Sequence, residues 1–216
     1  MNIIYYLLLF FIYSILGFIV ESIYTFIMNR KFLNRGFLIG PYLPIYGFGC
    51  LLLIILLKDS IKDPISLFLK AIIICSILEY FTSYIMEKIF KTRWWNYSNR
   101  KFNINGRICL ETMIPFGILG CLVMYVINPF IVNIILTIDI KLIYIISFIL
   151  LFIFIIDFTI SFKIIFNIRG IIKNVAKDST DEITKIVKDT LNKSKLYKRI
   201  SKAFPKIKVS DMFKIN

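Results

Sequence analysis

Five long apolar segments, separated by short polar stretches, fill the first 166 residues of the chain. They cover residues 2–28, 39–57, 65–89, 108–136 and 142–166. About 20 apolar residues are enough for a helix to cross a bilayer, so each segment predicts a transmembrane helix. The first segment contains Glu21 and lacks a small-residue cleavage site after its apolar core, which favours a permanent helix over a removed signal peptide. The pattern predicts an all-α fold, a polytopic membrane helix bundle of about five transmembrane helices.

Composition agrees with this class, and the basic residues predict the orientation of the bundle. The chain is 58% hydrophobic, with a mean hydropathy of +0.79. Lys and Arg are dense in the first and third connections, whereas the second and fourth contain only Lys58, Lys62 and Lys141. Because Lys and Arg accumulate on the cytoplasmic side, we expect the N-terminus outside and the C-terminus in the cytoplasm. The predicted location is the bacterial plasma (inner) membrane, crossed several times.

The composition changes after residue 166. We therefore divide the chain into a transmembrane helix bundle, residues 1–166, and a basic cytoplasmic tail, residues 167–216, with thirteen Lys or Arg and five Asp or Glu. In the tail, Ile183, Val187 and Leu191 recur at four-residue steps and predict a short amphipathic helix. Such a helix can lie on anionic lipid; a solvated, partly disordered tail is the alternative. Aromatic residues are sparse there, so nucleic acid is not an expected partner.

Four carboxylates lie inside the apolar segments, apart from Glu87 at the membrane edge of the third segment. They are Glu21, Glu79, Glu111 and Asp157. Ionisable groups in hydrocarbon are costly and normally face a bundle interior, a partner charge or a water-filled cavity. All four fall in the cytoplasmic half of the predicted helices, which predicts one polar chamber open to the cytoplasm. Ser83, one turn after Glu79, shares its helix face. Alternatively, each carboxylate pairs with an arginine and only holds helices together.

Residues 34–49 are rich in Gly and Pro and straddle the start of the second predicted helix. With Pro41, Pro44 and four glycines, this segment cannot form an uninterrupted ideal helix. Irregular backbone at membrane depth is tolerated only where protein or a water-lined cavity satisfies its polar groups. A segment that re-enters the bundle to line the chamber makes Arg35 and Tyr46 candidate site residues. A tight entry into an ordinary membrane helix is the alternative.

The third connection combines aromatic, amide and basic residues. Trp94 and its neighbouring tryptophan suit the aromatic belt at a membrane interface. Arginines at a membrane face can grip phosphate or carboxylate bidentately. Arg93, Asn105 and Arg107 therefore predict a site for an anion such as a lipid head group. Asn105 and the following glycine predict a turn. Arg107 and Glu111, four residues apart, form either a structural ion pair or part of that site.

Missing residue types narrow the chemistry. The chain has no histidine, its four cysteines lack the spacing of a metal site, and it has no P-loop pattern. We therefore expect no metal, no cofactor and no ATP hydrolysis by the chain alone. No recognised catalytic spacing is present either, which weighs against an enzyme.

Several motifs together resemble one known family. They are YSILG at 13–17, ESIY at 21–24, NRGFL at 34–38, GPY at 40–42, PIYG at 44–47, LEY at 78–80, RWWNYS at 93–98 and FNINGRICL at 102–110. Their joint order is similar to that of the putative ABC-transporter type IV family, also called CmpB-like, over residues 13 to 129. The resemblance implies a permease that works as a homodimer with a separate ATPase subunit. It assigns no roles to individual residues.

Three functions remain open at this stage. The first is a permease-type transport component whose carboxylates line a cytoplasm-facing pathway. The second is a membrane-embedded enzyme or binding protein for a lipid or isoprenoid-phosphate head group, held by arginines while a carboxylate acts as base. The third is a structural or assembly protein that uses the chamber only for packing. Membrane lipids are expected partners in every case.

Overall fold

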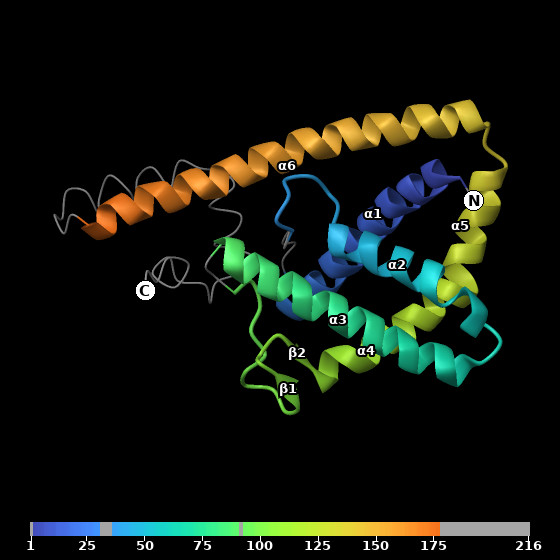
Figure 1. Ribbon diagram of the computed structural model, residues 1–216, viewed down its shortest axis with the longest axis horizontal. Helices are drawn as coiled ribbons and strands as arrows, with labels where there is room; N and C mark the ends of the chain where they lie inside the picture. The colour runs from blue at the N-terminus through green and yellow to red at the C-terminus, as the bar shows by residue number, and fades with distance from the viewer. Residues whose placement is uncertain (1, 31–35, 91–92, 178–216) are drawn as a thin grey trace.

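The computed structural model describes residues 2–30, 36–90 and 93–177. Within these ranges the chain is almost entirely helical, as Figure 1 shows. The elements are α1 (Ile3–Asn29), α2 (Pro44–Leu56), η1 (Lys58–Ser60), α3 (Pro64–Phe90), β1 (Asn103–Ile104), β2 (Ile108–Cys109), α4 (Leu110–Leu122), η2 (Val123–Ile127), α5 (Asn128–Leu136) and α6 (Ile140–Lys177). The predicted all-α membrane helix bundle is confirmed.

Four helical stretches in the described residues are long and apolar enough to cross a membrane, fewer than the five predicted. They are Ile3–Met28, Pro64–Phe90, Leu110–Leu136 and Ile140–Ile164. The third of these joins α4 and α5 through the π-helical turn η2. Residues 110–136 of the predicted segment 108–136 therefore form one continuous helical rod, whereas residues 108 and 109 belong to β2. These four agree with the predicted segments to within a few residues.

The second predicted segment, residues 39–57, differs from the prediction. Its helix α2 begins only at Pro44 and has 13 residues, a length of about 20 Å at 1.5 Å per residue. A hydrocarbon core is about 30 Å thick, so α2 alone is too short to cross it. Residues 36–43 are not helical. Proline disfavours the helical conformation of the residue before it, and Leu43, before Pro44, is extended.

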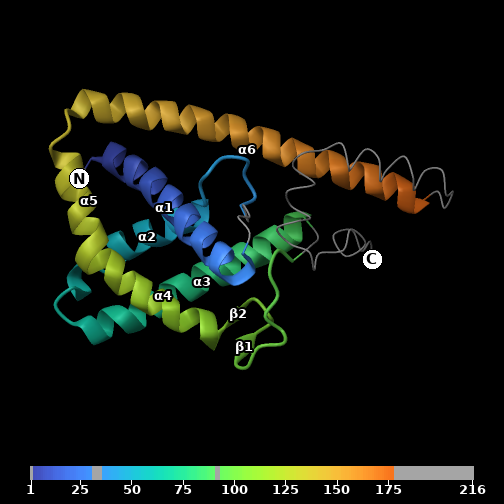
Figure 2. The same cartoon turned by 180° about the vertical axis from the view of Figure 1, so that it is seen from behind.

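Successive elements run back and forth across the bundle. In Figure 1, α1, α3 and α6 run in one direction, whereas α2 and the α4–α5 rod run in the other. Figure 2 shows the same arrangement from behind, with α3 beside α4 and α1 beside α2. Gly17 and Gly47 allow α1 and α2 to approach closely: a Cβ atom on Gly17 would overlap the Tyr46 ring, and one on Gly47 would overlap Ser14.

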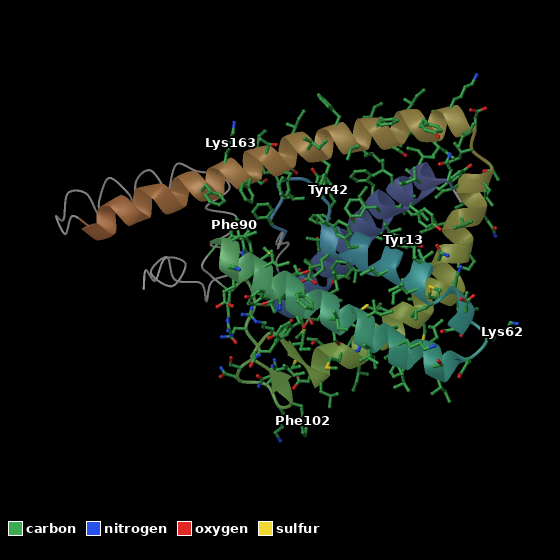
Figure 3. All side chains as sticks on the ribbon, in the orientation of Figure 1. Tyr13, Tyr42, Lys62, Phe90, Phe102 and Lys163 are labelled. Atoms are coloured by element: carbon green, nitrogen blue, oxygen red, sulfur yellow. The ribbon has the colours of Figure 1, made fainter. Side chains whose placement is uncertain are left out.

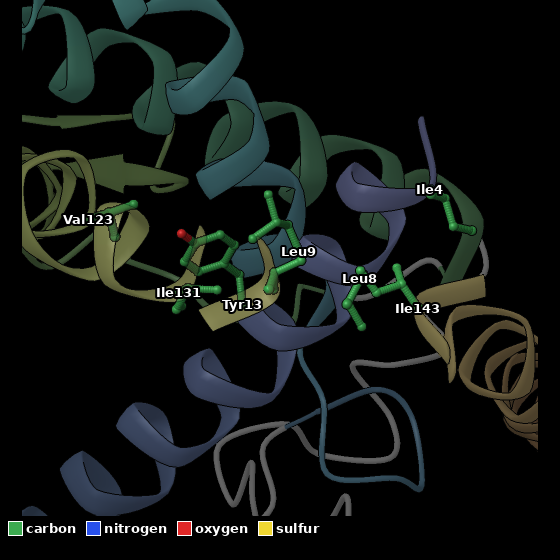
Figure 4. Close-up of a cluster of buried hydrophobic side chains, with 8 residues drawn as sticks. Ile4, Leu8, Leu9, Tyr13, Val123, Ile131 and Ile143 are labelled. Carbon is green, nitrogen blue, oxygen red and sulfur yellow. The ribbon is translucent and has the colours of Figure 1, made fainter. Parts of the chain in front are cut away.

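Two apolar clusters hold these elements together. The first joins α1 to η2, α5 and the start of α6, and Figure 4 draws its eight buried side chains: Ile4, Leu8, Leu9, Tyr13, Val123, Ile131, Ile135 and Ile143. Within it the Tyr13 hydroxyl donates to Asn128 Oδ1 at 3.0 Å. The second joins α2 to α3 and η2 through Leu53, Leu57, Leu67, Ala71 and Met124. The short helix α2 is therefore packed between α1 and α3.

Helix α6 continues beyond the predicted end of the bundle at residue 166. It runs from Ile140 to Lys177, 38 residues, or about 57 Å, and extends past the other helices in Figure 1. The first part of the predicted tail is therefore a continuation of this helix. The predicted amphipathic helix around residues 183–191 lies outside the described residues and stays a prediction.

Candidate functional site

One of the two buried carboxylates among the described residues is Glu79, on α3. Ser76, Glu79 and Ser83 are spaced by three and four residues, so they share one helix face, and all three are buried. Glu79 is only 8% exposed. Its Oε1 atom accepts a hydrogen bond from the Tyr97 hydroxyl at 3.4 Å. Its Oε2 atom is buried and has no hydrogen-bond partner among the described residues.

A second carboxylate and a second tyrosine lie close to Glu79. The Tyr46 hydroxyl donates to Glu21 Oε2 at 3.4 Å, and Tyr46 comes from the first turn of α2, directly after the non-helical segment. Both carboxylates act electrostatically on both phenols. Glu21, Tyr46, Glu79 and Tyr97 therefore form one group, which we call the acidic–tyrosine cluster. Burial, followed by the nearby Glu79 charge, raises the pKa of Tyr97, so this phenol stays a hydrogen-bond donor.

Two arginines of the third connection, Arg93 and Arg107, are held by a different carboxylate, Glu87. Its Oε2 atom lies 2.6 Å from Arg107 Nη2 and 3.0 Å from Arg93 Nε. Arg107 also donates to Ser83 Oγ at 3.2 Å and lies over the Tyr80 ring, 5.6 Å from its centre. These contacts bind the connection to the end of α3. They also engage both guanidinium groups within the protein, which does not favour the predicted anion site.

A short hairpin of β1 and β2 shapes this connection. Asn105 and Gly106 have φ values of 51° and 66°, the left-handed conformations that an Asn-Gly hairpin turn requires, and the predicted turn is therefore present. A Cβ atom on Gly106 would overlap Ser98 and Asn96. The Asn105 side chain donates to the Tyr80 hydroxyl at 2.9 Å. Asn105 thus stabilises the hairpin. Phe102, the residue before β1, points away from the bundle in Figure 3.

Arg107 and Glu111 do not pair with each other in the structure. Glu111 instead accepts from Arg100 at 3.0 Å, and both side chains are more than half exposed. The strand β2 lies between Arg107 and the start of α4 at Leu110. The two residues therefore do not lie on one helix, and their four-residue spacing does not bring them onto a common face.

Asp157, on α6, holds the non-helical segment in place. Its carboxylate accepts hydrogen bonds from the backbone N–H groups of Ile39 and Gly40 at 2.9 and 2.7 Å. It also accepts from the hydroxyls of Tyr42 and Ser161; Figure 3 places Tyr42 between α6 and α1. Asp157 therefore supplies the partners that irregular backbone at membrane depth needs. None of these four hydrogen bonds comes from a residue of the acidic–tyrosine cluster.

The remaining predicted site residues are placed as follows. Trp94 is buried in an aromatic cluster with Phe37 and Phe90 at the end of α3, which agrees with a packing role. Arg35 lies outside the described residues. Sequence reasoning did not single out Tyr97 as a site residue, because it resembles an ordinary interface tyrosine. Its only signal is its position in the motif RWWNYS. Within the described ranges, no group of three or more His, Cys, Asp or Glu residues could hold a metal ion.

The fold and these polar clusters define a polytopic α-helical membrane protein with carboxylates inside its bundle. The chain belongs to the family described as Putative ABC-transporter type IV, whose profile matches residues 8–162. This match confirms the family resemblance and extends it across all four predicted connections and into α6. No curated protein and no solved structure matches the chain.

Proposed function

We propose that the chain is the permease-type membrane subunit of a transport system, with a polar chamber that opens to the cytoplasm. The chamber is lined by the acidic–tyrosine cluster, formed by α1, α2, α3 and the third connection. The observation that carries this proposal is Glu79, a buried carboxylate in a membrane helix with one unpartnered oxygen. Carboxylates at such depth are costly to retain and characteristically mark pathways for ions or substrates. Membership of an ABC-transporter family supports the same function.

The broken second crossing supports a transport role as well. Transporters often place their binding sites beside discontinuous helices near the middle of the membrane. Here residues 36–43 are non-helical and lead into the short helix α2. In the first turn of α2, the Tyr46 hydroxyl donates to Glu21. A second crossing by residues 36–43 and α2 puts the first and third connections, where Lys and Arg are dense, on the same membrane face. We therefore count this segment as the second crossing.

Five alternating crossings place the two ends of the chain on opposite sides. The third connection carries Arg93, Arg100 and Arg107, and basic residues accumulate on the cytoplasmic side. The N-terminus is then outside, the tail is in the cytoplasm, and the host membrane is the plasma (inner) membrane of a bacterium. Because the chain has no nucleotide-binding motif, energy comes from a separate ATPase subunit on the cytoplasmic side, and two copies of the chain form the permease.

Purification from native membranes in a mild detergent tests this function. We expect a nucleotide-hydrolysing subunit to co-purify in near-stoichiometric amount, with native mass spectrometry reporting two copies of the chain. The variant Glu79→Gln should keep the partner, because Glu79 lies inside the bundle, but should alter ATP hydrolysis in lipid nanodiscs. The matched control Asp139→Asn, in the exposed turn before α6, should alter neither.

Absence of any ATPase from the purified chain would contradict the permease function. A stoichiometric phospholipid or isoprenoid phosphate found in its place would instead support the head-group-binding alternative. That alternative receives less support at present, because Glu87 already engages both Arg93 and Arg107.

A further inference from the structure

The acidic–tyrosine cluster has one hydrogen-bonding atom without a partner, and its chemistry restricts what can fill it. Glu79 Oε2 is buried and unpartnered within the described part of the chain, on a side chain that is 92% buried. A carboxylate oxygen accepts hydrogen bonds and attracts positive charge. A buried carboxylate without a partner is costly, because its desolvation is not compensated. The complementary group is therefore a positively charged hydrogen-bond donor.

The basic residues near Glu79 in the described ranges do not supply that group. Arg107 contacts Ser83, which lies one helical turn after Glu79 on α3. The charge of Arg107 is, however, matched by Glu87 at 2.6 Å. Arg93 binds the same carboxylate. None of the described Lys or Arg side chains forms a salt bridge with Glu79.

The surroundings of Glu79 also suit an organic cation. The Tyr97 hydroxyl donates to the other carboxylate oxygen of Glu79, and the Tyr46 phenol interacts electrostatically with the Glu79 carboxylate. Buried carboxylates hold ammonium groups by charged hydrogen bonds, and phenol oxygens can accept from further N–H groups of the same cation. A divalent metal ion would need more ligands than the described residues provide.

We propose that Glu79 receives the ammonium group of a transported molecule, so that the ligand class of this site is a small organic cation. This assignment rests on the proposed permease function and names its substrate class. Glu79 Oε2 accepts from the ammonium N–H, while the phenols of Tyr46 and Tyr97 flank the cation. The cation restores the charge balance that the described side chains leave incomplete at Glu79.

Two probes that differ mainly in charge test the proposal. Benzylammonium and benzyl alcohol have the same ring and nearly the same size. Thermal unfolding of the full chain in detergent is measured with each, because a ligand that binds only the native state raises the unfolding temperature. Benzylammonium should stabilise the wild type in a saturable manner, and benzyl alcohol at the same concentrations should not.

Substitution and chemical protection then locate the site. Glu79→Gln should weaken benzylammonium binding about tenfold or more, as expected for loss of a charged hydrogen bond, whereas Asp139→Asn should leave it unchanged. A second measurement needs no variant: modification of Glu79 in the wild type by a hydrophobic carbodiimide, mapped by mass spectrometry, should slow with benzylammonium and not with benzyl alcohol.

Equal effects of the two probes, or benzylammonium binding that persists in Glu79→Gln without protection of Glu79, would overturn the proposal. The outcomes also separate the two levels of inference. A co-purifying ATPase without charge-selective binding would reject the cationic ligand and leave the permease function standing. Charge-selective binding at Glu79 without any ATPase partner would support the ligand class and reject the function as an ATPase-driven permease.

Discussion

Replacement of Asp157 by asparagine should destabilise the protein strongly. Asp157 accepts four hydrogen bonds, and each of its oxygens receives one backbone N–H and one hydroxyl. In Asp157→Asn one oxygen becomes an NH2 group. The hydroxyl of Tyr42 or Ser161 on that side can turn to accept, but the backbone N–H of Ile39 or Gly40 cannot and loses its partner.

The size of this effect follows from the hydrogen bonds that are lost. A hydrogen bond to a charged group contributes about 1.5–3 kcal/mol, and a buried polar group left unpaired costs about 1–3 kcal/mol. We therefore expect Asp157→Asn to lower the free energy of unfolding by roughly 2–4 kcal/mol. For a chain of this size, each kcal/mol lowers the unfolding temperature by about 2–4 °C. Thermal unfolding in detergent, followed by tryptophan fluorescence, measures the change.

Two further variants calibrate the measurement. Tyr42→Phe removes a single donor to Asp157 and should cost about 1–1.5 kcal/mol. Asp139→Asn changes a carboxylate that accepts from the Lys141 N–H in an exposed turn; since Asn and Asp cap helices about equally well, it should cost less than about 0.5 kcal/mol. If Asp157→Asn also falls within about 0.5 kcal/mol of the wild type, the assigned role of Asp157 in holding residues 36–43 is refuted.

Four other substitutions probe the third connection and its contacts. Glu87→Gln should lower the free energy of unfolding by about 3 kcal/mol, because it leaves Arg107 buried without its counter-charge. Chemical unfolding in detergent measures this loss, and a much smaller value would show that the ion pair is dispensable. Gly106→Ala should cost about 1–3 kcal/mol through its left-handed backbone and should speed proteolysis of the hairpin; an unchanged cleavage rate would argue against the observed turn. Removing the exposed pair by Arg100→Ala or Glu111→Gln should change stability by less than about 1 kcal/mol, and a larger loss would show that the pair is not simply a surface contact.

The positions of the long helices were predictable from the sequence alone. A helix in lipid satisfies its backbone hydrogen bonds internally, so a run of apolar residues determines where it begins and ends with little help from its neighbours. The Asn105-Gly106 turn was predictable for a similar reason, since the left-handed conformation depends on those residues themselves. Pro41 and Pro44 signalled that the second apolar segment is irregular, but not that its helix begins as late as Pro44 and has only 13 residues.

The partners of the polar side chains were decided by the tertiary structure. Four-residue spacing suggested that Arg107 pairs with Glu111, yet Arg107 binds Glu87 because β2 separates it from α4. The position of Asp157 along its predicted helix suggested that it lines the chamber. Instead it binds the backbone of residues 39 and 40, more than a hundred positions away in the sequence. Periodicity specifies the face of a helix on which a residue lies, but not the element that packs against that face. That choice depends on how the whole bundle buries its apolar side chains, and it determines which carboxylate is satisfied by the protein and which, at Glu79, has an oxygen left without a partner.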